Sequence, residues 1–126
     1  MDDFVLGDRE LDVMGVLWDL GSGTVAEVRD RLPADLAYTT VLTILRNLEA
    51  KELLTHTAEG KAHRYFPKVA RKTARRSALT RIVDKLFHGQ PEQLVAQLVE
   101  DEHLTADDLR RLRAMLKPEP KKGGRR

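Results

Sequence analysis

The fold of this chain is indicated first by the segment Tyr38-Thr-Thr-Val-Leu-Thr-Ile-Leu-Arg-Asn-Leu-Glu-Ala-Lys51. Its apolar residues recur at i, i+3, i+4 and i+7, the spacing that lines up one face of an α-helix. This apolar stripe consists of Val41, Ile44, Leu45 and Leu48. The opposite face is rich in side chains that form hydrogen bonds, namely Thr39, Thr40, Thr43, Arg46 and Asn47. The pattern predicts a helix that buries one side and offers the other to a partner.

Two further helices are predicted before this one. The first runs from Asp8 to Leu20 and stops at Gly21, because glycine accepts the left-handed backbone that closes a helix. Thr24-Val-Ala-Glu27 then has the spacing of a capping box, in which the hydroxyl and the carboxylate each bond a backbone N–H at the helix start. Pro33 ends the short helix that opens there, because proline lacks the N–H that a helix interior needs.

Two short runs after the central helix predict a β-hairpin. Leu53–Thr57 and Ala62–Phe66 hold threonines and aromatic residues, and the break between them contains Gly60. Helix, capped short helix, polar-faced helix and hairpin is the order of a winged helix-turn-helix, whose third helix enters the DNA major groove. We therefore predict a mainly α fold with a small β-hairpin wing. A three-helix domain with an incidental hairpin is the alternative.

The rest of the chain is predicted to form amphipathic helices. One covers Ala70–His88, a second opens at Pro91, and a third is capped by Thr105 and stops before Pro118. About 45 residues of short helices cannot easily build a core of their own. We predict that they pack around a second copy at a two-fold interface, and folding back onto the N-terminal helices is the alternative. The predicted dimer contacts are Leu79, Ile82, Val83, Leu86, Leu94, Leu98 and Leu112.

The predicted organisation has three parts with very different charge. Residues 1–69 form the winged-helix domain, 70–117 the helical dimerisation region, and 118–126 a disordered basic tail. The formal net charge of the 126 residues is only +2. Residues 68–85 nevertheless hold seven basic residues and one acidic residue. Such a block favours a polyanionic partner, and here it is a candidate for extra contacts to the DNA backbone.

Several classes of function are excluded by what the sequence lacks. It has no cysteine, so disulfides, thiolate metal sites and cysteine nucleophiles are absent. Its histidines are too far apart for a helical i, i+4 zinc pair, and they are His56, His63, His88 and His103. No catalytic constellation, signal peptide or membrane-length apolar run is evident. We expect a cytoplasmic protein that is not an enzyme, has no metal or cofactor and does not insert into membranes.

The polar face of the central helix is the predicted base-reading surface. Thr40 and Thr43 lie three residues apart and therefore project from one side, where threonine meets several bases and the thymine methyl. Arg46 is a candidate for a guanine or a phosphate. Tyr38, Thr39 and Asn47 are predicted phosphate contacts, which fix register without specifying sequence. For the threonines, hydrogen bonds to carbonyls of their own helix are the alternative.

The hairpin supplies the remaining predicted DNA contacts. Lys61 at its tip and Arg64 on its second strand are candidates for phosphate contacts. His63 is also a candidate, and packing inward is its alternative because it alternates with Arg64 along the strand. For the whole chain, the alternative function is a winged-helix protein–protein interaction module without specific DNA binding.

These segments together resemble the penicillinase-repressor (BlaI/MecI) family. The matching segments are Leu36–Leu54, Leu11–Trp18, Thr24–Val28, Ala62–Tyr65, Leu86–Gln90 and Leu94-Val95, and the resemblance covers about residues 7–116. It implies a homodimeric repressor on a palindromic operator in double-stranded DNA. The implied target genes are those for β-lactamase, antibiotic resistance or envelope stress.

The resemblance also implies a partner, an inactivating protease of a membrane sensor. Staphylococcal-type members are cut between Asn and Phe, and the matching position in this chain is Gln97-Leu98. This departure argues against the same protease specificity. Copper-sensing relatives carry paired cysteines near the C-terminus, and this chain has none.

Overall fold

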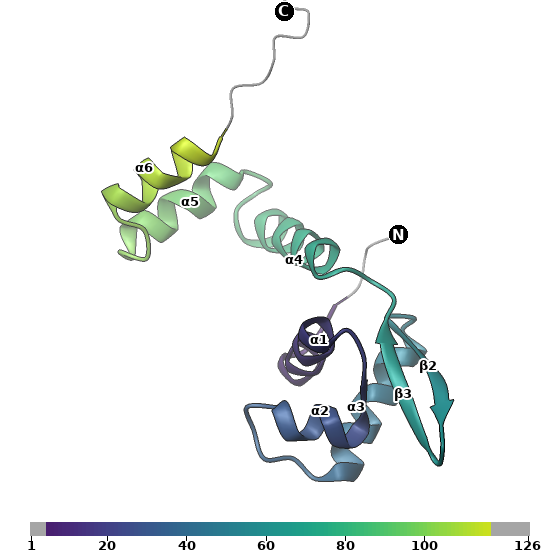
Figure 1. Cartoon of the computed structure of the whole chain (residues 1–126). Coiled ribbons are helices and arrows are strands. Elements are labelled where there is room, and N and C mark those ends of the chain that lie inside the picture. Colours follow the sequence, from purple (N-terminus) through teal and green to yellow (C-terminus); the bar gives the residue numbers. More distant parts are fainter. Residues whose placement is uncertain (1–4, 117–126) are drawn as a thin grey trace, which may run out of the picture. The chain divides into compact units, whose positions relative to one another are not determined.

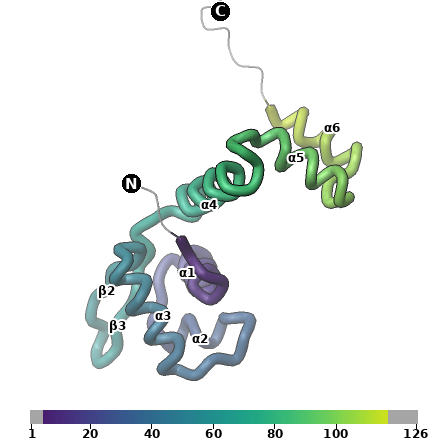
Figure 2. Tube along the Cα trace, turned by 180° about the vertical axis from the view of Figure 1, so that it is seen from behind, coloured from purple at the N-terminus to yellow at the C-terminus, as the bar shows by residue number. Residues whose placement is uncertain are grey.

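The computed structural model describes residues 5–116, which fall into two compact units. The first unit extends to Thr80 and the second begins at Arg81. Figures 1 and 2 follow the chain through the helices and strands of each unit from opposite sides. The predicted basic tail at 118–126 lies outside the described residues.

The first unit is a winged helix, as predicted from the sequence. Its elements in chain order are α1 (Asp8–Leu20), β1 (Gly23–Thr24), α2 (Val25–Arg31), α3 (Tyr38–Ala50), β2 (Leu54–Glu59) and β3 (Ala62–Pro67). The strands form an antiparallel sheet in the order β1-β3-β2. The central helix and the hairpin are confirmed. Strand β1, in which Gly23 pairs with Tyr65 and Thr24 with Arg64, was not predicted from the sequence.

Local interactions explain where α2 begins and where the hairpin turns. The hydroxyl of Thr24 accepts from the Glu27 N–H at 3.2 Å, and the Glu27 carboxylate accepts from the Thr24 N–H at 3.3 Å. The predicted capping box is therefore confirmed. Gly60 opens the two-residue turn between β2 and β3 with a φ of 61°, a left-handed backbone that favours glycine.

The core of this unit lies between α1, α2, α3 and the sheet. The α3 residues Val41, Leu45 and Leu48 are completely buried, which confirms the predicted stripe, while Ile44 is half-buried at its edge. The other fully buried side chains include Val13, Met14, Leu17, Val28, Leu54 and Tyr65. This packing leaves the polar side of α3 facing outward.

The start of α4 (Arg71–Leu86) also belongs to the first unit. The Trp18 indole Nε1 donates to the Val69 carbonyl at 2.8 Å, and the Arg71 guanidinium lies 5.4 Å from the centre of the Trp18 ring. Arg71 also donates to the Asp19 carboxylate at 2.6 Å. Ala74, one turn later, is buried. These contacts fasten the first turns of α4 to α1.

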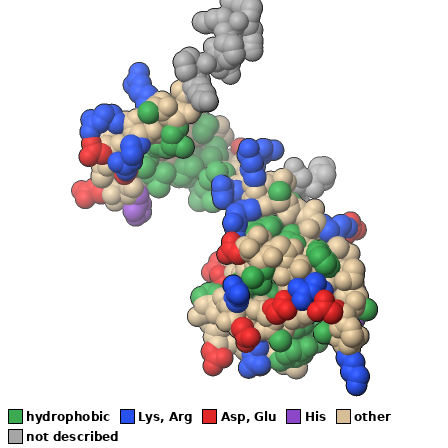
Figure 3. Space-filling model, in the orientation of Figure 1, with side chains coloured by type: hydrophobic (Ala, Val, Ile, Leu, Met, Phe, Trp, Pro, Cys, Tyr) green, Lys and Arg blue, Asp and Glu red, His purple; other side chains and the backbone are tan. Residues whose placement is uncertain are grey.

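The second unit continues α4 and adds α5 (Pro91–Glu100) and α6 (Ala106–Met115). The predicted Thr105 cap is present, since its hydroxyl accepts from the Asp108 N–H at 3.1 Å. Among residues 81–116, no side chain is buried, and several large apolar ones are well exposed. Figure 3 shows hydrophobic side chains gathered on the visible face of this unit. No helix within residues 5–116 is long and apolar enough to cross a membrane.

Gly23 occupies a place where a larger residue does not fit. A Cβ there would lie 3.1 Å from Val28 Cγ2 and 3.3 Å from Leu17 Cδ2, whereas a Cβ on Gly15 of α1 would meet nothing within 4 Å. We expect Gly23→Ala to lower the free energy of unfolding by about 1–3 kcal/mol through overpacking. Gly15→Ala should raise it by about 0.5–1 kcal/mol, because alanine favours the helix. Urea denaturation of both variants checks this, and equal effects would contradict it.

Candidate nucleic-acid interface

The structure brings the predicted base-reading residues together on the solvent side of α3. All six predicted side chains are exposed, and they are Tyr38, Thr39, Thr40, Thr43, Arg46 and Asn47. Their common direction follows from the burial of Val41, Leu45 and Leu48 on the opposite side of the helix. At the far end, Lys51 Nζ donates to the Glu10 carboxylate at 2.8 Å and so ties α3 to α1. The polar face of α3 therefore belongs to a helix that is held in place by its buried side chains and by the contact at its C-terminal end.

Thr43 is partly engaged by its own helix. Its hydroxyl donates to the Thr39 carbonyl at 3.0 Å, which is the back-bonding alternative considered for the threonines. A hydroxyl used in this way keeps its oxygen lone pairs and its methyl group for a ligand. Thr43 can therefore accept a hydrogen bond from a base amino group, or pack its methyl on a thymine methyl.

One face of the wing is linked to the end of α3. His56 Nδ1 lies 2.6 Å from Glu49 Oε2, which joins β2 to the last turn of α3. The His63 ring stacks on His56 with centroids 4.1 Å apart and an interplanar angle of 13°, and Tyr65 lies beside both rings. Burial raises the pKa of the Tyr65 phenol. His63 thus faces the α3 side of the wing but remains exposed.

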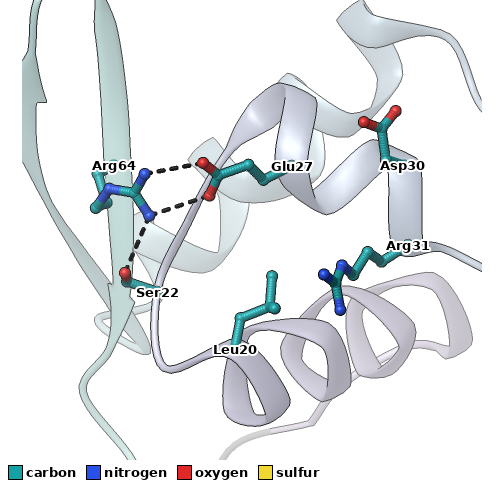
Figure 4. A pocket seen from close by; sticks show the side chains of 6 residues that line it. All are labelled: Leu20, Ser22, Glu27, Asp30, Arg31 and Arg64. Carbon is teal, nitrogen blue, oxygen red and sulfur yellow. Dashed lines mark hydrogen bonds and ion pairs between the residues drawn. The ribbon is translucent and has the colours of Figure 1, made fainter.

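Arg64 lies on the other face of the wing, between the carboxylates of Glu59 and Glu27. Figure 4 shows the Glu27 side of this contact, together with Ser22. Its Nε donates to Glu59 Oε1 at 2.7 Å, and its terminal nitrogens donate to Glu27 at 2.9 and 3.0 Å. The hydroxyl of Ser22 accepts another bond at 3.1 Å. Hydrogen bonds from Arg64 lower the pKa of Glu27 and of Glu59, and the carboxylates in turn raise the pKa of Arg64. Arg64, which was predicted to contact a phosphate, is thus bound by side chains of the protein itself.

The other predicted cations have different surroundings. Arg46 and Lys61 are exposed and make no hydrogen bond or ion pair with any of residues 5–116. In the basic block, Arg71 is paired with Asp19, while Lys72, Arg75 and Arg76 project into solvent. Exposed unpaired cations are the groups that contact phosphates at the smallest cost in lost bonds.

Sequence reasoning missed the partners that organise the wing. Glu27 was recognised as a helix cap through the spacing of Thr24-x-x-Glu27, but nothing local connects it with Arg64, 37 residues later. The pairing of Glu49 with His56 was missed for the same reason. Among the residues described, no cluster of three or more potential ligands could hold a metal ion.

Comparison with known proteins places this geometry in a family. The model of the penicillinase repressor family matches residues 6–118. The chain belongs to the penicillinase repressor family. The resemblance inferred from the sequence is thereby confirmed, and the family is one of transcriptional repressors and not of enzymes.

Individual relatives support this assignment. The chain is 38% identical over 106 residues to the transcriptional regulator BlaI of Mycobacterium tuberculosis. The aligned region covers 82% of this chain and 62% of that protein. It is 21% identical over 115 residues to the methicillin resistance regulatory protein MecI of Staphylococcus aureus, covering 90% and 94% of the two chains. The solution structure of the DNA binding domain of the repressor BlaI superposes with a TM-score of 0.50 and 31% identity over 54% of this chain and 85% of that one.

The two residues predicted from the sequence as the counterpart of the cleavage position lie inside a helix. Gln97 and Leu98 are in the second half of α5, where the Gln97 side chain donates to Asp101 at 3.1 Å and Leu98 is half-buried. A protease binds its substrate in an extended form, so this repressor-family chain would have to unwind α5 before a cut there.

The Arg64 cluster predicts a pH-dependent contribution to stability. Arg64 lowers the pKa of Glu27 and Glu59 in the folded state. The stability that this contact adds to the fold is therefore fully present above the pKa of glutamate in the unfolded chain, about 4.3. It is lost as the pH falls through the lower pKa values of the folded state. We expect Arg64→Met to lower the melting temperature clearly at about pH 7 and much less at about pH 2.5. Thermal unfolding followed by circular dichroism measures both.

Arg75→Met is the matched control for that experiment, because Arg75 is exposed on α4 and makes no ion pair with residues 5–116. Its melting temperature should follow the wild type at both pH values. A deficit in the Arg64 variant that is equally large in acid would contradict the assignment of the stabilisation to the two carboxylates.

Proposed function

We propose that the chain is a dimeric, sequence-specific DNA-binding transcriptional repressor. The observation that carries this proposal is the exposed hydrogen-bonding face of α3 beside a wing, in a unit similar to the DNA binding domain of BlaI. A helix of this kind fits the major groove, and a wing reaches the neighbouring backbone. The protein would act by competing reversibly for a site on DNA, without covalent chemistry.

The proposed contacts divide into those that read bases and those that bind phosphates. Thr40 and Thr43 face base edges, and Arg46 binds a guanine or a phosphate. The remaining contacts are to the backbone, and they come from Tyr38, Thr39, Asn47, Lys61 and His63. Arg64 is not among these contacts, because its guanidinium is bound by Glu27, Glu59 and Ser22.

Dimerisation is proposed because α4 and the second unit leave large apolar side chains exposed. Leu79 is 47% exposed, Ile82 41%, Leu86 70% and Leu112 44%. A two-fold interface would bury the same residues on both copies, and Val83, Leu94 and Leu98 of the second unit are half-buried. Two recognition helices related in this way fit a palindromic operator with half-sites about 34–36 Å apart or a multiple of that distance.

The biological setting is proposed from the relatives. The chain would act in the cytoplasm on genes for β-lactamase, antibiotic resistance or envelope stress, and its similarity to the methicillin resistance regulatory protein MecI supports the link to antibiotic resistance. Release from DNA would follow a cut by the protease of a membrane sensor. Because Gln97-Leu98 differs from the staphylococcal pair and lies within α5, that protease would have its own specificity.

The central experiment measures binding to DNA from the chain's own promoter. Fluorescence anisotropy at about 150 mM salt should give an affinity at least about 1,000-fold tighter than for a shuffled duplex. The logarithm of the affinity should fall steeply and linearly with the logarithm of salt concentration. Equal affinity for both duplexes would refute specific operator binding. No salt-dependent DNA binding at all would favour the protein–protein module.

Thr43→Val tests base reading in the same assay. Valine keeps the shape and the methyl group but loses the hydroxyl acceptor, so discrimination between operator and shuffled DNA should fall by about 1–3 kcal/mol. Thr80→Val, at an exposed position of α4, is the matched control and should leave discrimination unchanged. An unchanged Thr43→Val would limit the role of Thr43 to apolar contact.

Leu86→Asp tests the dimer. A charge at this exposed apolar position would be desolvated in the interface, so the variant should be monomeric by light scattering and should bind a full operator far more weakly. The neighbouring Lys85→Asp places the same carboxylate outside the apolar stripe and should remain dimeric. A wild type that is monomeric at micromolar concentration would refute the proposal directly.

A further inference from the structure

Arg64 connects three separate parts of the first unit. It lies on β3, and it binds Glu59 on β2, Glu27 on α2 and Ser22 in the connection between α1 and β1. Glu59 is the last residue of β2, directly before the Gly60-Lys61 turn. The side chain therefore fastens the outer end of the hairpin to the start of α2, as Figure 4 shows for the α2 side.

The guanidinium has no donor left for a phosphate. Arginine carries five N–H groups, and Arg64 makes five hydrogen bonds to the three acceptor side chains. The two carboxylates outnumber the single cation, so the cluster of Glu27, Glu59 and Arg64 has a net negative charge. A DNA phosphate that approached Arg64 would have to displace a carboxylate and would meet the repulsion of both.

Lys61 differs from Arg64 in each of these respects. It is exposed at the tip of the hairpin, and none of residues 5–116 forms an ion pair or hydrogen bond with it. A two-stranded ribbon has little stability on its own, so the position of its tip depends on contacts with the rest of the domain. Farther from the tip those contacts are the pairing of β1 with β3, the contact between His56 and Glu49, and the buried side chains of Tyr65 and Leu54. Near the tip, Arg64 provides them.

We propose that Arg64 is a positioning residue, which holds the wing on α2 so that Lys61 meets a phosphate of the bound DNA. The inference rests on the proposed DNA-binding function and deepens it. It replaces the expectation from the sequence that Arg64 itself binds a phosphate.

Glu27→Gln separates the two roles by the sign of its effect. If Arg64 bound phosphate, removing the Glu27 charge would liberate the guanidinium, reduce repulsion and tighten DNA binding. If Arg64 positions the wing, the same change loosens the clamp and weakens binding. Glutamine still accepts the Thr24 N–H and keeps the capping box, so the helix start is preserved. Tighter binding by Glu27→Gln would overturn the proposal.

Arg64→Lys gives a second separation. Lysine retains the positive charge that a phosphate contact needs, but it cannot form a planar fork between two carboxylates. We expect Arg64→Lys and Arg64→Met to weaken DNA binding to a similar extent, by about fivefold or more. Near-wild-type affinity in Arg64→Lys together with a loss in Arg64→Met would identify a phosphate contact.

A double-mutant cycle between Arg64 and Lys61 tests directly whether Arg64 positions Lys61. In the wild-type background, Lys61→Ala should weaken binding and reduce the salt slope by about 0.9, the value for one lost phosphate contact. In the Arg64→Met background, Lys61→Ala should cost much less, because the tip is no longer held at the phosphate. Asn47→Ala on α3 is the control, and its cost should be the same in both backgrounds. Additive costs of Arg64→Met and Lys61→Ala would overturn the proposal.

Each measurement is made on the operator and on a shuffled duplex, at a temperature where circular dichroism shows every variant to be folded. A wing contact to phosphate does not depend on sequence, so the cycle is decisive on either duplex. Equal wild-type affinity for the two duplexes would refute operator specificity while the cycle still decides the role of Arg64. Wild-type protein that binds neither duplex would refute both proposals.

Discussion

Val41, Leu45 and Leu48 are fully buried against α1 and α2, and their burial sets the rotation of α3 about its axis. A turn of one residue, about 100°, would carry these side chains toward water and bring Thr40 and Thr43 toward the core. Exposing each apolar side chain would cost about 1.5–3 kcal/mol, and burying an unpaired hydroxyl would add to that cost. The direction of the polar face is therefore a consequence of the core. The contact between Glu49 and His56 then joins one face of the wing to this helix.

The basic residues contribute to the structure through the partners that they bind more than through their number. Lys51, Arg64 and Arg71 each bind a carboxylate and connect elements that are distant in sequence. Arg46 and Lys61 have no such partner among the described residues and remain exposed. A cation that already forms bonds within the protein gains little from a phosphate, because the new bond replaces an existing one. The cations that hold the fold together and those offered to a ligand are thus different residues, although the sequence alone does not distinguish them.

Periodicity and local chemistry were enough to predict most elements. The stripe of α3, the Thr24–Glu27 capping box and the hairpin turn at Gly60 depend on residues within one or two turns of each other. The features that were missed depend on distant partners. Gly23 and Thr24 form a strand only because β3 lies beside them, and two residues carry no periodic signal. Arg64 follows the pattern of an exposed wing cation, and its carboxylates become visible only when α2 and β2 are folded around it. Trp18 fixes the start of α4 through the Val69 carbonyl, a contact that no spacing rule anticipates.

The uncovered apolar surface of the second unit has a consequence for DNA affinity. One winged helix offers a small number of phosphate contacts, and such binding is weak at physiological salt. Two copies joined through α4, α5 and α6 would bind their second half-site as an intramolecular step, at an effective concentration in the millimolar range for a short connection. Affinity for the whole operator would then depend on side chains such as Leu86 and Leu112 that touch no base. Any event that separates the two copies, whether a cut or an unfolding of α5, would release DNA while leaving α3 and the wing intact.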